Sequence, residues 1–307
     1  MKKVKCYLCG SDVKTALFLQ EGRDPYLEIV SKNLLKVPRY WYVCDDCGYV
    51  YRSPVLEESE LKKLYENYEK DIFKNSTSDD YFDKIINIPE PDSENAQKTI
   101  WLERTLIEHG LGSDLHAISV LVVGCGGGTL LYALSKKFGC TNLYGVELNQ
   151  PYADLAKRRL DADIRNEKYQ SGMFGKKFDL VVFTKVLEHI PEPLPFIAEL
   201  ARDLSTKGIL FLEVPDIMDI YSLPPSHERF YIPHIYYFSA NTLRELLARE
   251  GLSILTNRSI TTHRGRSYLQ LLAGHSSEAK PSETPYDDPQ ALKRKRAGYA
   301  SGIDLTK

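Results

Sequence analysis

The segment Val120-Leu-Val-Val-Gly124-Cys-Gly126-Gly-Gly128-Thr-Leu-Leu131 carries the clearest structural signal in the 307-residue chain. It begins with an apolar run, continues with three glycines at alternate positions, and becomes apolar again after Thr129. The apolar run predicts a buried strand. The glycines permit a sharp turn that exposes backbone N–H groups to a ligand at the start of a helix. The segment therefore predicts a strand, a ligand-binding turn and a helix in direct succession.

Strands and helices alternate on the carboxyl side of this segment. Ser239 caps the last expected helix, and Gly251 follows its end. Such alternation predicts an α/β fold with a doubly wound, mostly parallel sheet. The expected strands are Ile118–Val123, Asn142–Glu147, Phe178–Thr184, Ile209–Val214, Leu252–Thr256 and Ser267–Leu272, and the expected helices are Thr129–Phe138, Pro151–Leu160, Leu194–Leu204 and Ala240–Glu250.

A carboxylate ends the strand that follows the glycine turn. Glu147 lies 19 residues beyond Gly128, where a carboxylate can accept hydrogen bonds from both hydroxyls of an adenosine ribose. A dinucleotide fingerprint would need glycine at position 129, which is Thr129 in this chain. The pattern therefore favours an adenosine-containing ligand other than a dinucleotide, and a dehydrogenase is the weakest alternative.

The glycine pattern and the segment FDLVVFTKVLEHI at 178–190 resemble the first and fourth motifs of the class I S-adenosylmethionine (SAM)-dependent methyltransferases. The resemblance implies a seven-stranded, Rossmann-like methyltransferase sheet with SAM as cofactor. Asp163 is one candidate for the acidic residue that holds the adenine amino group in many relatives. The resemblance further implies that Gly124, Gly126 and Gly128 line the methionine and ribose portions of SAM, that Glu147 binds the ribose hydroxyls, that Leu148 packs on the adenine, and that Lys185 lies near the methionine end.

Four of the six cysteines form two CxxCG units, namely Cys6, Cys9, Cys44 and Cys47. No export signal precedes them, so they are expected to be metal ligands or thiols rather than disulfides. Two such pairs can close a tetrahedral site around zinc, and four sulfur ligands leave no open position, so the zinc would be structural. Iron fits the same ligand set, and a redox-active pair of thiols is the alternative to a metal site.

The segment His234-Ile-Tyr-Tyr-Phe-Ser239 resembles the HxxYFS segment of sugar C-methyltransferases, which also carry an N-terminal four-cysteine zinc domain. The resemblance implies methyl transfer to a small acceptor, a nucleotide sugar or another carbohydrate. His234, with a pKa near the reference value of about 6.5, is the candidate general base. Tyr231 would orient the substrate or share the proton path, and His189 would order the loop after the fourth strand. Pro233 stands where those enzymes often have glutamate, so carbon, oxygen and nitrogen all remain possible as the methylated atom.

Composition excludes several other classes of protein. Lys and Arg number 40 against 42 Asp and Glu, so no basic excess points to nucleic acid. The longest apolar runs, such as Ile118–Val123, are far shorter than the ~18 residues of a membrane span. The basic N-terminus leads into Cys6 without an apolar region, which is unlike a signal peptide. A cytoplasmic enzyme is expected.

The chain is expected to divide into four parts. Ser53-Pro54 is expected to start a helix, residues 74–80 with Pro89 and Pro91 to form a loop or lid, and Asp92–Gly110 to form a second helix. The four parts are a zinc-ribbon-like module at 1–53, a helical linker or lid at 54–115, a SAM-dependent methyltransferase core at 116–275, and a loosely held polar tail at 276–307.

Two further functions remain open besides methyl transfer to a carbohydrate. One is O- or N-methylation of another metabolite or a glycan terminus, and the other is a catalytically silent SAM-binding module.

Overall fold

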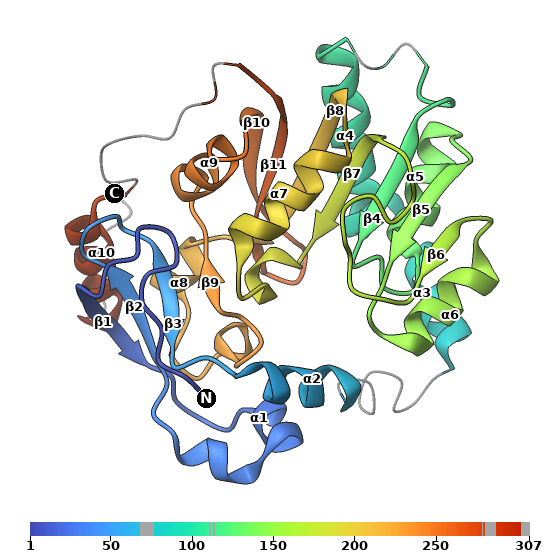
Figure 1. Cartoon of the computed structure of the whole chain (residues 1–307). Coiled ribbons are helices and arrows are strands. Elements are labelled where there is room, and N and C mark those ends of the chain that lie inside the picture. Colours follow the sequence, from blue (N-terminus) through green and yellow to red (C-terminus); the bar gives the residue numbers. More distant parts are fainter. Residues whose placement is uncertain (68–76, 111, 113, 278, 280–286, 302–307) are drawn as a thin grey trace.

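A seven-stranded sheet organises most of the molecule (Figure 1). The computed structural model describes every residue except 68–76, 111, 113, 278, 280–286 and 302–307. The strand order is β10-β11-β8-β7-β4-β5-β6, with parallel pairing from β8 to β6 and antiparallel pairing of β10 and β11. The strands are β4 (Ser119–Val123), β5 (Asn142–Val146), β6 (Asp163–Arg165), β7 (Phe178–Thr184), β8 (Leu204–Pro215), β10 (Leu252–Thr261) and β11 (Ser267–His275).

This order confirms the predicted doubly wound, mostly parallel sheet. The chain runs outward from β4 to β5 and β6, and then returns to place β7 on the other side of β4. Ligands of open α/β sheets bind beyond the carboxyl ends of the strands at such a reversal. The site is therefore expected beyond the ends of β4 and β7.

Helices cover both faces of the sheet because alternate side chains of each strand point to opposite sides. Val120 and Val122 pack toward one helical layer, whereas Leu121 and Val123 pack toward the other. The first layer contains α4 (Glu94–Glu108), α5 (Thr129–Phe138) and α6 (Gln150–Arg159), and the second contains α7 (Pro193–Asp203) and α9 (Ala240–Ala248). Among the described residues, no helix has the length and apolar character that crossing a membrane requires.

A second, four-stranded antiparallel sheet holds the N-terminal region (Figure 1). Its order is β1-β2-β3-β9, and β9 comes from the segment that follows β8. Cysteines of the N-terminal region share one apolar cluster with residues of α7 and α9. The N-terminal region is thus continuous with the large sheet, and the division at residue 53 stays a prediction. The strands are β1 (Lys14–Leu19), β2 (Tyr40–Cys44), β3 (Val50–Ser53) and β9 (Tyr236–Tyr237).

Two expectations for the segment after β3 are wrong. Ser53 does not cap a helix: it ends β3 opposite Tyr40, its hydroxyl accepts a hydrogen bond from the Val4 N–H, and α2 (Glu58–Asn67) begins only at Glu58. Part of the expected loop is α3 (Ser78–Ile86), while residues 74–76 lie outside the described residues. Thr77 and Asp80 form a reciprocal capping box at its start, a signal that was present in the sequence.

The expectation of a loosely held tail at 276–307 is also wrong for the part of the tail that forms a helix. Helix α10 (Pro289–Ser301) packs against β2 and against α8 (Met218–Ser222). Leu292 is buried, and the Arg296 guanidinium donates hydrogen bonds to the carbonyls of Ile220 and Leu223 at 2.8 and 2.9 Å. Arg296, the last residue of the basic run at 293–296, therefore contributes hydrogen bonds to the fold. The short elements that the sequence did not indicate include α1 (Pro25–Val30), α8, β6 and β9.

Candidate functional site

The glycine turn lies between β4 and α5, as predicted. Gly124, Gly126 and Gly128 have φ of +72°, +54° and +85°, a region that other residues rarely adopt. A Cβ atom at Gly124 would lie 2.6 Å from Val186 Cγ2, and one at Gly128 would lie 2.6 Å from Leu160 Cδ1. At Gly126 it would meet no atom within 4 Å. The outer glycines therefore allow close packing, whereas Gly126 faces open space.

Glu147 follows β5 and binds the glycine turn through its carboxylate. Its Oε2 accepts a hydrogen bond from the Gly126 N–H at 2.8 Å, and its Oε1 accepts one from the Asn149 N–H at 2.9 Å. The next side chain, Leu148, is 55% exposed. Both residues thus lie beside the turn, at the carboxyl edge of the sheet, where the carboxyl ends of the parallel strands meet. A ribose and an adenine bound at this edge would contact them.

Asn166 is a residue of this edge that the sequence did not single out. Its side-chain amide donates to the carbonyls of Glu147 and Leu148 at 2.8 and 3.0 Å, so it fixes the backbone of the expected adenosine contact. Its only sequence signal is its position directly after β6. Asp163, the candidate for the adenine amino group, lies at the start of β6, opposite Tyr144, and pairs with Arg165 at 3.7 Å. The structure does not bring Asp163 to the carboxyl edge.

Lys185 follows β7 with a φ of +60°, the left-handed region. Its ammonium lies 2.8 Å from Glu94 Oε2 and 3.9 Å from Glu213 Oε1. Burial lowers the pKa of Lys185, but the combined attraction of Tyr268, Glu213 and Glu94 outweighs it, and the net pKa is raised. Lys98 also binds Glu213, at 2.9 Å. Lys185 therefore lies at the expected edge, where its charge ties the first turn of α4 to β7 and β8.

Two histidines from the segments that follow β7 and β8 lie side by side. His189 ends the short helix η4 (Leu187–His189), and His234 lies between β8 and α9, as predicted. Their ring centroids are 4.9 Å apart. His189 Nδ1 lies 2.9 Å from the Pro233 carbonyl oxygen, and His234 Nδ1 lies 2.8 Å from the Arg229 carbonyl oxygen. Since a carbonyl oxygen only accepts, each Nδ1 carries the proton, which leaves each Nε2 with a lone pair in the neutral ring.

Glu188 completes this group, which we call the His–Glu cluster (Glu188, His189 and His234). Its carboxyl group is 1% exposed, with Oε1 3.9 Å from His189 Nε2. Burial raises the pKa of Glu188 to about 8 and lowers the pKa of His189 to about 4. Burial, with His189 and Arg229 nearby, lowers the pKa of His234 well below the reference value expected from the sequence. Both imidazoles are therefore neutral near pH 7.

Tyr231 lies near His234 along the chain, but its ring turns elsewhere. Its carbonyl accepts a hydrogen bond from the His234 N–H at 3.1 Å. The ring packs edge-on against Tyr26 of α1, with centroids 6.0 Å apart. The structure thus places His234 beside His189 and Glu188, a contact that no sequence pattern indicated.

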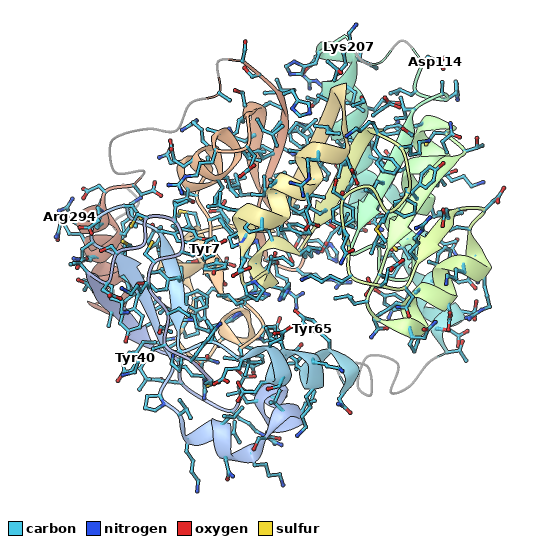
Figure 2. The ribbon with its side chains drawn as sticks, in the orientation of Figure 1. Tyr7, Tyr40, Tyr65, Asp114, Lys207 and Arg294 are labelled. Atoms are coloured by element: carbon cyan, nitrogen blue, oxygen red, sulfur yellow. The ribbon has the colours of Figure 1, made fainter. Side chains whose placement is uncertain are left out.

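The four cysteines of the CxxCG units converge as expected for a metal site. The Cys6 and Cys47 sulfurs are 3.6 Å apart, the Cys9 and Cys44 sulfurs are 3.5 Å apart, and all four lie within 4.8 Å of one another. Zn–S bonds of about 2.3 Å in a tetrahedron place the sulfurs about 3.8 Å apart, so the residues fit zinc. Gly10 and Gly48 both have φ of +78° and close the two turns. Tyr7, between the first two cysteines, lies on the side of the N-terminal sheet that faces the core (Figure 2), with its ring centroid 6.4 Å from that of Tyr236.

A family model described as a methyltransferase domain matches residues 82–257, more than half of the chain. The chain belongs to the methyltransferase domain family. The match covers the glycine turn, Glu147, Lys185 and the His–Glu cluster, and this part of the chain is a SAM-dependent methyltransferase domain. Both sets of CxxCG cysteines lie outside it.

Curated relatives match only part of the methyltransferase domain. The ubiquinone biosynthesis O-methyltransferase of Actinobacillus pleuropneumoniae serotype 7 is 32% identical over 110 residues, which cover 32% of this chain and 46% of that protein. The protein of the same name from Coxiella burnetii (strain Dugway 5J108-111) is 33% identical over 98 residues, covering 30% of this chain and 41% of its own length. The chain thus spans less than half the length of these relatives.

Among solved structures, the magnesium protoporphyrin IX methyltransferase of Synechocystis PCC 6803 with bound SAM is 20% identical, with a TM-score of 0.49. The match covers 73% of this chain and 100% of that one. The same enzyme with bound SAH has the same identity and TM-score over 66% of this chain and 97% of its own. The assignment of the methyltransferase domain rests on the family match and the sheet topology.

Proposed function

We propose that the whole chain transfers the methyl group of SAM to a small acceptor that binds between the glycine turn and the His–Glu cluster. One contact carries the proposal: Val186 fills the space beside Gly124 and directly precedes the loop with Glu188 and His189. The cofactor turn and the paired histidines are therefore neighbours at the reversal point of the sheet. Methyl transfer needs this closeness, because the nucleophile must approach the methyl carbon in line.

The cofactor contacts follow from the carboxyl edge. SAM would lie along Gly126, where the open side of the turn supports a ligand, with Gly124 and Gly128 shaping the turn. The ribose hydroxyls would bind Glu147, and the adenine would pack on the exposed Leu148. Lys185, held beside Glu94, would face the methionine end of the cofactor.

His234 would act on the acceptor through Nε2, whose lone pair is kept free by the hydrogen bond from Nδ1 to the Arg229 carbonyl. The acceptor oxygen, carbon or nitrogen forms a bond to the methyl carbon as the carbon–sulfur bond of SAM breaks. The electron pair stays on the sulfur of the product, and the acceptor proton passes to Nε2. His189 would hold the neighbouring loop through its hydrogen bond to the Pro233 carbonyl.

A nucleotide sugar or another carbohydrate is the acceptor class that we propose. The support is the combination of the HIYYFS segment with a four-cysteine module whose sheet includes β9, the strand formed by that segment. O-methylation of another metabolite is the second candidate, favoured by the O-methyltransferase names of the curated relatives. The cysteine cluster would hold zinc in a structural role, because its four thiolates close the coordination.

Titration calorimetry with SAM, followed by release of S-adenosylhomocysteine in the presence of nucleotide sugars and of phenolic acceptors, tests this proposal. Turnover on nucleotide sugars alone supports the carbohydrate acceptor, and turnover on phenols alone supports the second candidate. SAM binding without turnover on any acceptor would indicate a silent SAM-binding module. Absence of SAM binding would contradict the proposal altogether.

A further inference from the structure

The buried carboxyl group of Glu188 has an oxygen without a hydrogen-bond partner among the described residues. Within the described part of the chain, Glu188 Oε2 has no hydrogen-bond partner although the residue is 1% exposed. Burial of an unpaired carboxyl oxygen is costly, and such groups in folded proteins commonly have a partner that the protein chain does not supply. The neighbours of Glu188 are two imidazoles whose Nε2 atoms are also free for a ligand.

The three side chains of the His–Glu cluster converge on one point. One ligand atom from each of Glu188, His189 and His234 lies within 4.8 Å of the others. Ligands about 2.1 Å from a common ion lie about 3–3.5 Å apart, so a closure of at most about 1.3–1.8 Å from the 4.8 Å limit completes the geometry. We expect movement of the Glu188 carboxyl group to supply this closure, because hydrogen bonds at Nδ1 hold the two imidazole rings in place.

The orientation of both imidazoles is already fixed for ligation. A metal-binding histidine typically donates its other ring N–H to a carbonyl or carboxylate, which sets the tautomer and the ring direction. The Pro233 and Arg229 carbonyls do this for His189 and His234, at 2.9 and 2.8 Å. Two imidazole nitrogens and one carboxylate with open positions form a set that suits divalent ions of the first transition row.

We propose that Glu188, His189 and His234 bind a divalent transition-metal ion such as Mn²⁺, Fe²⁺ or Zn²⁺, whose open positions take an oxygen of the acceptor. This inference rests on the proposed function and changes the role of one residue in it. His234 Nε2 then binds the ion in place of a proton. The ion itself lowers the pKa of the acceptor hydroxyl, and solvent water takes the proton.

Mn²⁺ separates this site from the cysteine cluster, because thiolates select zinc whereas Mn²⁺ prefers nitrogen and oxygen ligands. The full chain, with zinc in its cysteine cluster, is titrated with Mn²⁺, and free Mn²⁺ is followed by electron paramagnetic resonance. About one Mn²⁺ per chain is expected to bind. Glu188→Gln and His189→Ala should each weaken binding by at least about 10-fold. His263→Ala is the matched control, since His263 is exposed in the turn between β10 and β11, and it should bind like the parent.

Thermal unfolding of each variant distinguishes loss of a ligand from loss of the fold, and the near-isosteric Glu188→Gln keeps the volume of the site. Parental Mn²⁺ affinity in folded Glu188→Gln and His189→Ala would overturn the metal site, as would absence of Mn²⁺ binding by the parent. Methyl transfer that persists after removal of all metal but the cysteine-bound zinc would overturn it too, while leaving the proposed function with His234 as base. Failure to bind SAM contradicts the proposed function whatever the metal content.

Discussion

Gly126 differs from Gly124 and Gly128 of the cofactor turn in what surrounds its Cα. Gly124 and Gly128 each abut a side chain, Val186 and Leu160, whereas nothing lies within 4 Å of a Cβ at Gly126. All three glycines have φ > 0, but substitution is expected to have a different effect at the outer two than at Gly126. Substitution at the outer glycines disturbs packing, and substitution at Gly126 occupies the space proposed for SAM.

Gly126→Val is expected to fold and to lose SAM binding. The left-handed backbone costs a non-glycine residue about 1–2 kcal/mol, and the new side chain would enter the proposed cofactor space. Gly128→Val, its matched comparison, should lower the melting temperature more strongly because it collides with Leu160 and Ala156. Calorimetric titration and thermal unfolding measure the two effects. SAM binding by Gly126→Val at parental affinity would place the cofactor elsewhere.

Glu147→Ala should weaken SAM binding by about 1.5–3 kcal/mol, the range for hydrogen bonds to a charged group. The variant also removes the acceptor of the Gly126 and Asn149 N–H groups, so the turn loses part of its support. Glu108→Gln, an exposed carboxylate at the far end of α4, is the control and should leave affinity unchanged. Equal SAM affinities for the two variants would show that Glu147 does not bind the ribose.

His234→Ala should keep SAM affinity and lower kcat by about 10²–10⁴-fold once an acceptor is known. The reason is loss of Nε2, the atom proposed to meet the acceptor or its metal ion. His263→Ala should keep parental kcat. Steady-state kinetics with saturating SAM gives the comparison. A His234→Ala enzyme with parental kcat would make His234 a structural residue that only anchors the Arg229 carbonyl.

At the scale of elements, α10 shows how a polar tail becomes part of the structure. Arg296 is 6% exposed, its guanidinium caps the carbonyls at the end of α8, and it lies over the ring of Phe18. Lys293 pairs with Asp45, between the cysteines of the second CxxCG unit, at 2.8 Å. The helix thus joins the N-terminal sheet to the segment after β8 (Figure 1).

Arg296→Ala is expected to destabilise the protein by about 1–3 kcal/mol, because the carbonyls of Ile220 and Leu223 lose their buried donor. Arg294→Ala is the matched control. Arg294 projects from the outer side of α10 (Figure 2), and its one ion pair among the described residues, with Asp288, is exposed and worth about 0–1 kcal/mol. Urea unfolding of both variants measures the difference. Similar midpoints would mean that α10 adds little to the stability of the fold.

For the whole molecule, the cysteine cluster and the methyltransferase domain share one apolar core. Cys6, Cys44 and Cys47 belong to the same cluster of buried residues as Phe183 and Leu243. The segment that follows β8 also supplies β9 to the N-terminal sheet, where Tyr236 and Tyr237 pair with β3. Loss of zinc is therefore expected to affect the stability of the whole chain.

Cys44→Ser should lower the zinc content from about one per chain and shift a single unfolding transition to lower temperature. Cys140→Ser also changes a buried thiol, but outside the cluster, and should keep the zinc. Zinc analysis and calorimetry of both variants provide the measurement. Two separate transitions, with only one sensitive to zinc, would show that the N-terminal module unfolds independently. Full zinc occupancy in a variant without Cys6 and Cys9 would contradict the metal site.

The sequence by itself determined the features that local pattern encodes. Apolar runs alternating with capped helices predicted the doubly wound sheet, and glycines at alternate positions predicted the turn at 124–128. The positions of Glu147 and of the four cysteines followed from spacing along the chain. These features depend on backbone conformation and on periodicity within a few residues, so they can be identified without knowledge of the packing.

Only the tertiary structure decided what meets across the sheet. His189 and His234 are 45 residues apart in the sequence, and their contact requires the loops after β7 and β8 to meet at the same edge. The pairing of Lys185 with Glu94 likewise depends on where α4 packs. The sequence also missed β9 as part of the N-terminal sheet. Such contacts arise from burial of apolar surface over the whole fold, which brings distant segments together without a local pattern that marks them.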